Sequence, residues 1–333
     1  MASEELPKVS IIVAARNSAD TIGECLRSLF EQNYPLKHFE VLVMDGCSTD
    51  DTVKIAECFP AQVFSLPFNA PAAYNYALKF ARFPVVGFVD ADAKVERNWL
   101  LKLVVHLGEP TVAGVSGGIE TWNFENLWAR SIGYELKVRY RRLGAYTGRI
   151  ATMNLLLKRS VIEEVGGWDE TFPSQYDTDF GFRLSQRGYK IAYVPEAKCF
   201  HLHRGTLGAY WRQQLQYGKN TLRLYFKHGR LARGDEITDF GMNIQPLVFL
   251  VIFSFAFLGI WDMLRFLWLV AGGLFVITFV YFVVSAVRVS LKFRDWSAMR
   301  LVVLYFVRAF AWLSGAALAA LSFLRHKRRL KKQ

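Results

Sequence analysis

The sequence predicts an α/β domain with an open, mostly parallel sheet, followed by a C-terminal α-helical membrane domain. Up to about residue 240, short apolar runs alternate with segments of helical periodicity, as expected when strands alternate with helices. Further along, the chain becomes almost wholly apolar over stretches long enough to cross a bilayer. We therefore divide the 333 residues into a first domain at 1–240 and membrane helices with a basic tail at 241–333.

Four strands are predicted in the first part of the chain, and the first, second and fourth end in polar residues. They cover residues 9–13, 39–44, 63–66 and 85–90. Helices are expected between them, at about 21–32, after Asp50, and at 72–80. A further strand is expected at 190–194. The first strand is followed by no Gly-x-Gly-x-x-Gly turn and the sequence has no Walker lysine motif, which disfavours a dinucleotide oxidoreductase or a P-loop NTPase.

The strand at 85–90 is the most informative, because two carboxylates, Asp90 and Asp92, stand one residue apart where it ends. Ligands of open α/β sheets bind at the carboxyl ends of the strands. Two neighbouring carboxylates are costly there unless a positive charge lies between them. A hard divalent cation that also holds substrate phosphates fits this requirement. The alternative is that Asp-x-Asp only ends the strand in a turn.

Three apolar stretches are candidate membrane spans, at about 246–261, 266–287 and 301–324. A span needs about 20 apolar residues. The second stretch meets this length, the first is marginal, and the third carries Arg308 near its start. Residues 1–5 are polar and acidic, unlike a signal peptide, so we expect a multi-pass protein of the cell membrane with its first domain in the cytoplasm.

The basic residues behind the net charge of +12 flank these stretches, which suits membrane orientation and anionic lipid better than nucleic acid. Four lie in the loop at 288–300 and five in the tail at 327–332. A third full span would put the basic tail outside, against the positive-inside rule. Either the tail breaks the rule or 301–324 is re-entrant or interfacial; we expect three spans. A further basic group at 137–149 is either a solvated helix face or a lipid contact.

The four cysteines show no metal-ligand spacing and fit a reducing compartment.

Five motifs in the first part of the chain occur in one order at suitable spacing. They lie at 9–17, 40–52, 90–92, 166–170 and 177–184. Together they resemble the family 2 glycosyltransferases, which have a GT-A nucleotide-sugar-binding fold. The resemblance covers about residues 8–230, and the apolar C-terminal part resembles membrane-anchored members that act on lipid-linked acceptors.

The resemblance implies roles for individual residues. Those implied in nucleotide-sugar binding are Ala15, Arg16, Asn17, Asp45, Asn75, Asp90 and Arg204. Asp92 is implied as the direct ligand of Mg²⁺ or Mn²⁺, with Asp90 beside it and His201 as a further ligand or, alternatively, a structural histidine. Asp177 is implied as the general base and Asp179 is the runner-up. Both carboxylates could instead only complement the dipole of a helix start.

Three positions depart from the family pattern. Gly46 stands where a second acidic residue is usual, Tyr74 where a basic residue is usual, and Tyr176 where glutamate is usual. The segment at 211–219 resembles the Gln-x-x-Arg-Trp element of processive synthases, but Tyr217 and Gly218 replace Arg-Trp. It either closes over donor or acceptor or is an amphipathic helix on the membrane surface.

The sequence therefore predicts an inverting, metal-dependent glycosyltransferase. Its expected partners are a nucleotide-diphosphate sugar, a polyprenyl-linked or glycan acceptor and membrane lipids, with no nucleic acid. A processive polysaccharide synthase is one alternative, although this chain has few spans for a channel and lacks the intact Gln-x-x-Arg-Trp element. A non-catalytic membrane scaffold that binds nucleotide sugars is the other alternative.

Overall fold

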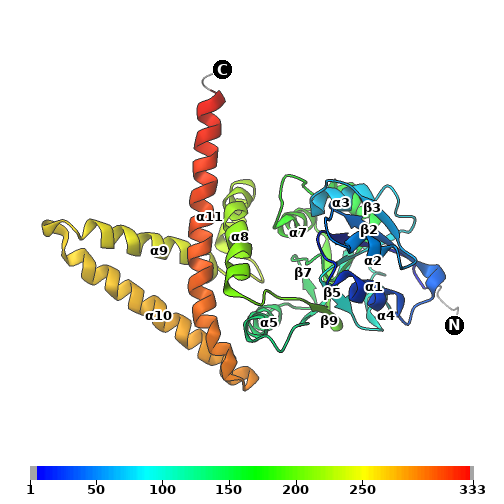
Figure 1. Cartoon of the computed structure of the whole chain (residues 1–333), viewed down its shortest axis with the longest axis horizontal. Helices are drawn as coiled ribbons and strands as arrows, with labels where there is room; N and C mark the ends of the chain where they lie inside the picture. The colour runs from blue at the N-terminus through cyan, green and yellow to red at the C-terminus, as the bar shows by residue number, and fades with distance from the viewer. Residues whose placement is uncertain (1–5, 331–333) are drawn as a thin grey trace. The chain divides into compact units, whose positions relative to one another are not determined.

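The computed structural model describes residues 6–330, with side chains as far as Phe323 (Figure 1). The acidic N-terminal residues 1–5 and the side chains of the basic tail at 327–332 lie outside this described part. The chain forms two compact units, which we describe separately. The first consists of Met1–Trp122 and Tyr140–Leu202, and the second of Asn123–Arg139 and His203–Gln333.

The first unit contains a nine-stranded sheet within the described residues, in the order β3-β2-β1-β4-β8-β6-β9-β5, with β7 paired to β9. The strands are β1 (Val9–Ala15), β2 (Phe39–Asp45), β3 (Gln62–Ser65), β4 (Val85–Asp90), β5 (Ala93–Val95), β6 (Val112–Thr121), β7 (Tyr146–Thr147), β8 (Leu155–Lys158) and β9 (Lys190–His201). The four strands predicted from their apolar runs, β1 to β4, form a continuous parallel half. In the other half, β6 and β9 are parallel, whereas β8 pairs antiparallel with β4 and β6.

Helices cover both faces of this sheet. They are α1 (Ile22–Phe30), α2 (Thr52–Ala56), α3 (Ala70–Ala77), α4 (Trp99–Val104), α6 (Arg159–Val165) and α7 (Tyr176–Gln186), with a 3₁₀ turn, η1, at Leu36–His38. Successive residues of β1 point to opposite faces: Ile11 and Val13 join the core under α1 and α4, and Ile12 joins the core under α3 and α6. The strands β1, β2 and β4 are thus buried on both sides, as continuous apolar runs predict, whereas the edge strand β3 is only partly buried.

The second unit is helical. It contains α5 (Leu127–Tyr140), except its last residue, and α8 (Leu207–Lys227), α9 (Phe240–Leu258), α10 (Phe266–Phe293) and α11 (Leu301–Leu330). Short 3₁₀ turns connect them: η2 (Gly229–Arg233), η3 (Asp262–Leu264) and η4 (Trp296–Arg300). By length and composition, three segments of the described chain could cross a membrane: Phe240–Leu258, Phe266–Phe293 and Trp296–Phe323.

The first of these helices begins six residues before the predicted start at 246, because Asp239 caps it by accepting from the Met242 backbone N–H and Pro246 is tolerated inside it. The second helix continues to Phe293, so Arg288 and Lys292 of the predicted loop at 288–300 lie in its last turns. The structure otherwise has an apolar helix at each predicted stretch.

Candidate functional site

Three polar loops meet at the carboxyl edge of the parallel strands in the first unit. The registers pair Ala14 with Asp90 on one side, and Ala15 with Asp45 on the other. The end of β1 therefore separates the Asp45 carboxylate from the Asp90–Asp92 pair by one strand. This places the residues predicted at 15–17, 45 and 90–92 along one edge, where ligands of such sheets bind.

The loops after β1 and β2 are joined by hydrogen bonds. The backbone N–H of Asn17 donates to Ser48 Oγ (2.7 Å), and the Asn17 side-chain oxygen accepts from the Thr49 N–H (2.8 Å). Asn17 has a positive φ of 49°, a conformation that asparagine tolerates better than most residues. Arg16 and Asn17 are both exposed, so they are available to a ligand at this edge.

Asp45 is the buried member of this edge, with 2 % of its surface exposed. Its carboxylate accepts from the Ser48 hydroxyl (2.5 Å) and from the Ser65 hydroxyl (2.6 Å). The Ser48 backbone N–H also donates to the two carboxylate oxygens (3.3 and 3.1 Å), so the protein already supplies most of the roughly four hydrogen bonds that a carboxylate can accept. At the next residue, Gly46, a Cβ would lie 3.1 Å from the Phe68 carbonyl oxygen, so the acidic residue that is usual there would make a tight contact with this backbone.

Asp90, Asp92 and His201 form a cluster whose ligand atoms all lie within 4.8 Å of one another. His201 Nε2 is 3.2 Å from Asp92 Oδ1. Two carboxylates and an imidazole within this range are a donor set that fits a divalent cation such as Mn²⁺. The structure thus brings together the three residues that the sequence predicted as metal ligands.

Backbone pairing sets the position of His201 at the end of β9. Ala93 pairs with His201 in the antiparallel β5–β9 ladder, and the Leu202 N–H donates to the Asp92 carbonyl (2.9 Å). The predicted strand at 190–194 therefore runs on to His201. Between the two parts of β9, the register against β6 shifts at Gly117 and Gly118.

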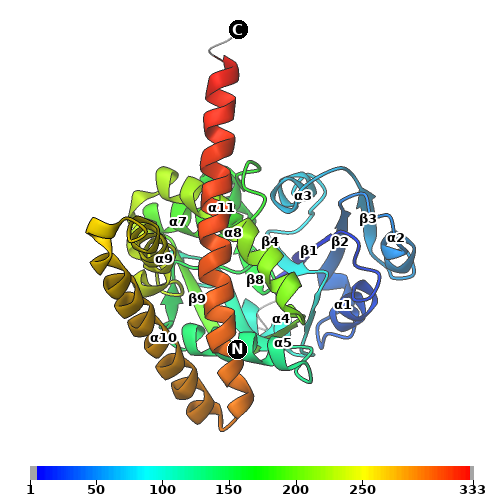
Figure 2. The same cartoon turned by 60° about the vertical axis from the view of Figure 1, so that its left-hand side comes forward.

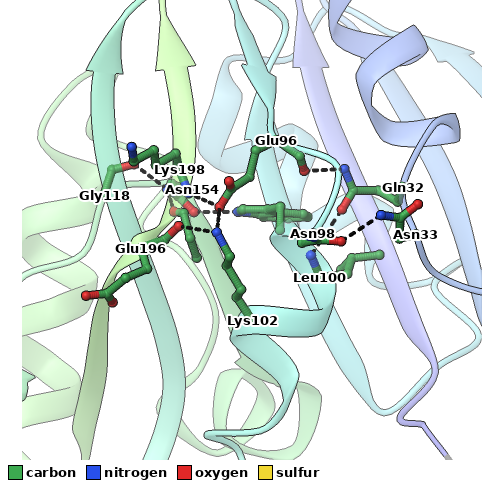
Figure 3. Close-up of polar contacts among 12 residues, drawn as sticks. Gln32, Asn33, Glu96, Asn98, Leu100, Lys102, Gly118, Asn154, Glu196 and Lys198 are labelled. Carbon is green, nitrogen blue, oxygen red and sulfur yellow. Dashed lines mark hydrogen bonds and ion pairs between the residues drawn. The ribbon is translucent and has the colours of Figure 1, made fainter.

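A buried polar network fixes that shift (Figure 3). Asn154, which is fully buried, donates to the carbonyls of Gly118 (2.8 Å) and Ala197 (3.0 Å) and accepts from the Trp99 indole (2.7 Å). A Cβ at Gly117 would lie 2.1 Å from the Ala197 carbonyl oxygen, so only glycine fits. The network lies outside the predicted site, and the sequence carries no local signal for it.

The two carboxylates of the cluster repel each other. Burial and the neighbouring Asp92 raise the pKa of Asp90 well above its ordinary value, and His201 and a hydrogen bond from Tyr74 only partly oppose this. A cation between the two carboxylates would favour their ionised forms. The electrostatics therefore agree with the donor set in pointing to a bound cation.

Tyr74 and Tyr176, two of the departures from the family pattern, lie together beside this cluster. Their rings are 5.9 Å apart, and both contact Trp168. The fully buried Tyr74 donates its hydroxyl to Asp90 Oδ1 at 3.2 Å. Tyr74 thus orients a candidate metal ligand, a function that sequence reasoning missed because it considered only the lost positive charge.

Asn75 lies next to Tyr74 but its side chain holds a loop of the protein. Its amide nitrogen donates to the Trp168 carbonyl and to Glu170 Oε1 (both 2.9 Å), and its oxygen accepts from the Trp168 N–H (2.8 Å). Gly167 has a φ of 68°, and a Cβ there would lie 2.6 Å from Asn75 Oδ1. The structure therefore gives Asn75 a positioning contact with the loop at 166–170.

The two candidate bases in the first turn of α7 have different surroundings. Asp177 is half-buried, whereas Asp179 has no exposed surface and forms an ion pair with Arg183 (2.8 Å). Arg183 also donates to the carbonyls of Val165 and Gly167. Asp179 is therefore engaged in packing α7 against the preceding loop, and Asp177 is the carboxylate that a substrate could reach.

Arg149 is a neighbour of Asp177 that the sequence did not single out, because it appeared only as one member of the basic group at 137–149. Its guanidinium donates to the Thr178 hydroxyl. Burial raises the pKa of Asp177, and the positive charge of Arg149 opposes that increase. The negative charge of Asp177 in turn helps to raise the pKa of Asp90, so the two carboxylates are within electrostatic range.

Arg204 belongs to the second unit, which begins again at His203. It lies three residues after His201 along the chain. Its predicted contact with the donor diphosphate stays a prediction.

Comparison with known proteins identifies a family match and several similar glycosyltransferases. Residues 10–166 match the family Glycosyl transferase family 2. The chain is similar to the glycosyltransferase AglE of Haloferax volcanii, with 26 % identity over 229 residues that cover 66 % of this chain and 75 % of AglE. It is also similar to the probable glycosyltransferase YdaM of Bacillus subtilis, with 27 % identity over 347 residues that cover 93 % of this chain and 81 % of YdaM.

One solved structure resembles almost the whole chain. This is the mannosyltransferase PcManGT from Pyrobaculum calidifontis in complex with GDP-Man and Mn²⁺, with a TM-score of 0.60 and 20 % identity, covering 95 % of this chain and 88 % of PcManGT. At this identity the similarity establishes the fold. The α/β architecture predicted from the alternation of strands and helices is confirmed.

Proposed function

We propose, from the premise that this chain carries a glycosyl transferase family 2 domain over residues 10–166, that it transfers a sugar with inversion to a membrane-associated, polyprenyl-linked acceptor. The family and the GT-A fold predicted from the sequence motifs are confirmed, and the chain is a glycosyltransferase. The donor in this proposal is a nucleotide-diphosphate sugar. The observation that carries it is the Asp90–Asp92–His201 cluster at the sheet edge where Asp45 also lies.

The donor is assigned to this edge. The loop at 15–17 and the Asp45 carboxylate bind the nucleoside, and Asp90 lies nearer the ribose or a bound water. Asp92 and His201 hold the cation, with Mn²⁺ favoured over Mg²⁺ because an imidazole suits transition metals better. When bound, the cation supplies Lewis-acid stabilisation of the leaving diphosphate. Arg204 is a further candidate for neutralising that diphosphate.

Asp177 is assigned as the general base. In the transfer step, the acceptor oxygen bonds to the anomeric carbon, the bond from that carbon to the diphosphate oxygen breaks, and the acceptor hydroxyl proton moves to Asp177. Attack opposite the leaving group inverts the anomeric configuration. A raised pKa brings the carboxylate closer to the pH at which it works, which favours proton transfer.

The membrane helices support an acceptor in or at the bilayer. Three helices are long and apolar enough to cross a membrane. The four cations at 288–300 favour a cytoplasmic position for that loop by the positive-inside rule. With α9 and α10 crossing as a hairpin, the first unit lies on the same cytoplasmic side.

Donor binding and turnover by the detergent-purified full chain test this proposal. GDP-mannose and a panel of UDP-sugars are added with Mn²⁺, Mg²⁺ or EDTA, and thermal shift and donor hydrolysis are measured. We expect one donor to raise the melting temperature and to be hydrolysed only with metal. Addition of membrane lipid extract then yields a lipid with one added sugar, whereas a processive synthase yields a polymer. Binding without turnover in the presence of lipid would contradict the proposal.

A further inference from the structure

All three candidate spans are long and apolar enough to cross a membrane, but they differ in packing. For α11, 44 % of the most apolar window is buried, compared with 22 % for α9 and 11 % for α10. Much of that burial comes from α8, a helix that is not apolar. Since α5, α8, α9, α10 and α11 belong to one unit, their contacts can be compared directly.

The middle of α11 packs closely against α8. The Trp312 indole donates to Gln214 Oε1 at 2.9 Å, and both side chains are buried. A Cβ at Gly218 would lie 2.6 Å from the Trp312 backbone, and a Cβ at Gly315 would lie 2.4 Å from the Leu215 carbonyl. The two backbones therefore approach so closely that each helix needs a glycine at the crossing.

The helix that lies against this middle segment is strongly polar. Its charged and amide residues are Arg212, Gln213, Gln214, Gln216, Lys219, Asn220, Arg223 and Lys227. Charged side chains are expensive in the hydrocarbon core and favour the bilayer surface, where long cationic side chains reach the headgroups. If α11 crossed the bilayer, its middle would lie near the bilayer centre and would carry α8 there with it.

The first half of α11 adds a second polar contact. Arg308 is 4 % exposed, and its guanidinium lies 2.5 Å from Glu135 Oε1 on α5 and 3.4 Å from Gln245 Oε1 on α9. The buried guanidinium of Arg308 suits a helix that packs against other protein helices at the bilayer surface. It does not suit a transmembrane helix that faces lipid.

The orientation of the helices separates α11 from the hairpin of α9 and α10. In Figure 1, α9 extends sideways from the upright α11, and in Figure 2 it is foreshortened while α11 stays upright, so α9 lies across α11. The α9 helix has 19 residues, or about 28 Å, which matches a hydrocarbon core of about 30 Å. A bilayer crossed by α9 is therefore not crossed in the same direction by α11.

We propose that only α9 and α10 cross the membrane and that α11 lies with α8 along the bilayer surface on the side of the first unit. The surface formed by α8 and α11 fits an anionic lipid bilayer, because α8 carries several cations. Large apolar side chains are exposed at Phe226 and Trp296, where they can enter the interface. The basic tail then stays on the same side as the cationic loop at 288–300. This removes the conflict with the positive-inside rule and does not depend on the proposed sugar transfer.

Cysteine labelling in sealed vesicles with a membrane-impermeant maleimide tests the proposal. Cys47 and Cys58 are exposed, whereas Cys25 and Cys199 are buried. The Cys47→Ser protein retains Cys58 as a marker of the first unit. In a Cys47→Ser, Cys58→Ser background, Met263→Cys marks the hairpin turn and a cysteine added after Gln333 marks the tail; Met263 is 93 % exposed.

We expect the tail cysteine to be labelled from the same side as Cys58, and Met263→Cys only from the opposite side. If the tail cysteine were labelled from the same side as Met263→Cys and from the side opposite to Cys58, α11 would cross the membrane and the proposal would be overturned. Labelling of all three from one side would also overturn it, because the hairpin would then not cross. As a second measurement, a spin label at Leu318→Cys should report a shallow depth, and one at Ile277→Cys in α10 a deep one. Equal depths would contradict the surface position.

Discussion

The two units each contain a cluster of charged side chains, and the clusters differ in composition. In the second unit, the Arg308 guanidinium meets Glu135 and Gln245, so one positive charge faces one negative charge. In the first unit, two carboxylates and one imidazole lie within 4.8 Å of one another. A pair of opposite charges contributes to packing. Two carboxylates and a histidine at such short distances are a donor set for a divalent cation, which indicates a binding site.

The largest expected effect on chemistry comes from Asp177→Asn. Loss of a general base slows transfer by roughly 10²–10⁴-fold. Mn²⁺ binding is expected to stay unchanged, because Asp177 is outside the metal cluster. Single-turnover transfer and Mn²⁺ titration measure the two properties separately. The matched control is Asp179→Asn, which leaves Arg183 without its carboxylate and lowers the melting temperature. Full transfer activity of the Asp177→Asn protein would refute the assigned base.

The pH dependence of transfer sharpens this assignment. The base must be deprotonated, so kcat/KM rises as the pH increases through the pKa of Asp177. Burial raises that pKa, and therefore the acid limb should lie above the range of an ordinary aspartate. Arg149→Met removes the charge that opposes the increase and should move the limb to higher pH. A limb that stays in place in the Arg149→Met protein would show that another group controls it.

Asp92→Asn tests the metal cluster directly. Loss of this ligand weakens the hold on the cation that stabilises the leaving diphosphate, and we expect transfer to fall by roughly 10²–10³-fold. Mn²⁺ should raise the melting temperature of the wild type but not of the variant. The exposed Asp20→Asn change is the control, and equal stabilisation of both variants by Mn²⁺ would place the metal elsewhere.

Substitutions in the Arg308–Glu135 cluster of the second unit should change stability. Arg308→Met leaves the Glu135 carboxylate buried without its partner and should destabilise the protein by about 3–5 kcal/mol. The double variant Glu135→Met, Arg308→Met should recover most of that loss, since an apolar replacement of a buried pair is often neutral. Unfolding in detergent measures both changes. If the double variant were as unstable as Arg308→Met, this cluster would be more than a neutral packing unit.

The parallel half of the sheet could be predicted because its signals are local. The run at 85–90 is apolar on both faces, and β1, β2 and β4 are each followed by or end in polar residues. Asp90 and Asp92 were predicted as cation ligands from their place at the strand end, whereas His201, 109 positions after Asp92, was added from the family resemblance. The contacts of Asn154 and Arg149 could not be predicted, because each depends on partners brought together only by folding.

The helical unit shows the limit of hydropathy. Composition gives α11 a mean hydropathy of 1.8, close to the 1.9 of α9, and hydropathy alone does not separate them. What separates them is the close approach of Gly218 and Trp312, a contact between segments about 90 residues apart. The sequence of a segment thus shows whether it is long and apolar enough to span a membrane. Whether it does so also depends on which other helices pack against it.

The smallest effect expected is that of Tyr74→Phe. The ring keeps its contacts with Phe88, Trp168 and Tyr176, but the hydroxyl that donates to Asp90 is lost. Groups that orient metal ligands typically change metal affinity about 10–100-fold, and the long 3.2 Å hydrogen bond favours the lower end of that range. Mn²⁺ titration followed by electron paramagnetic resonance measures the change without any substrate. Tyr76→Phe on the same helix is the control, since the Tyr76 ring packs on Phe68 and Phe80. Equal Mn²⁺ affinity in the two variants would mean that Asp90 does not need the Tyr74 hydroxyl to hold the cation.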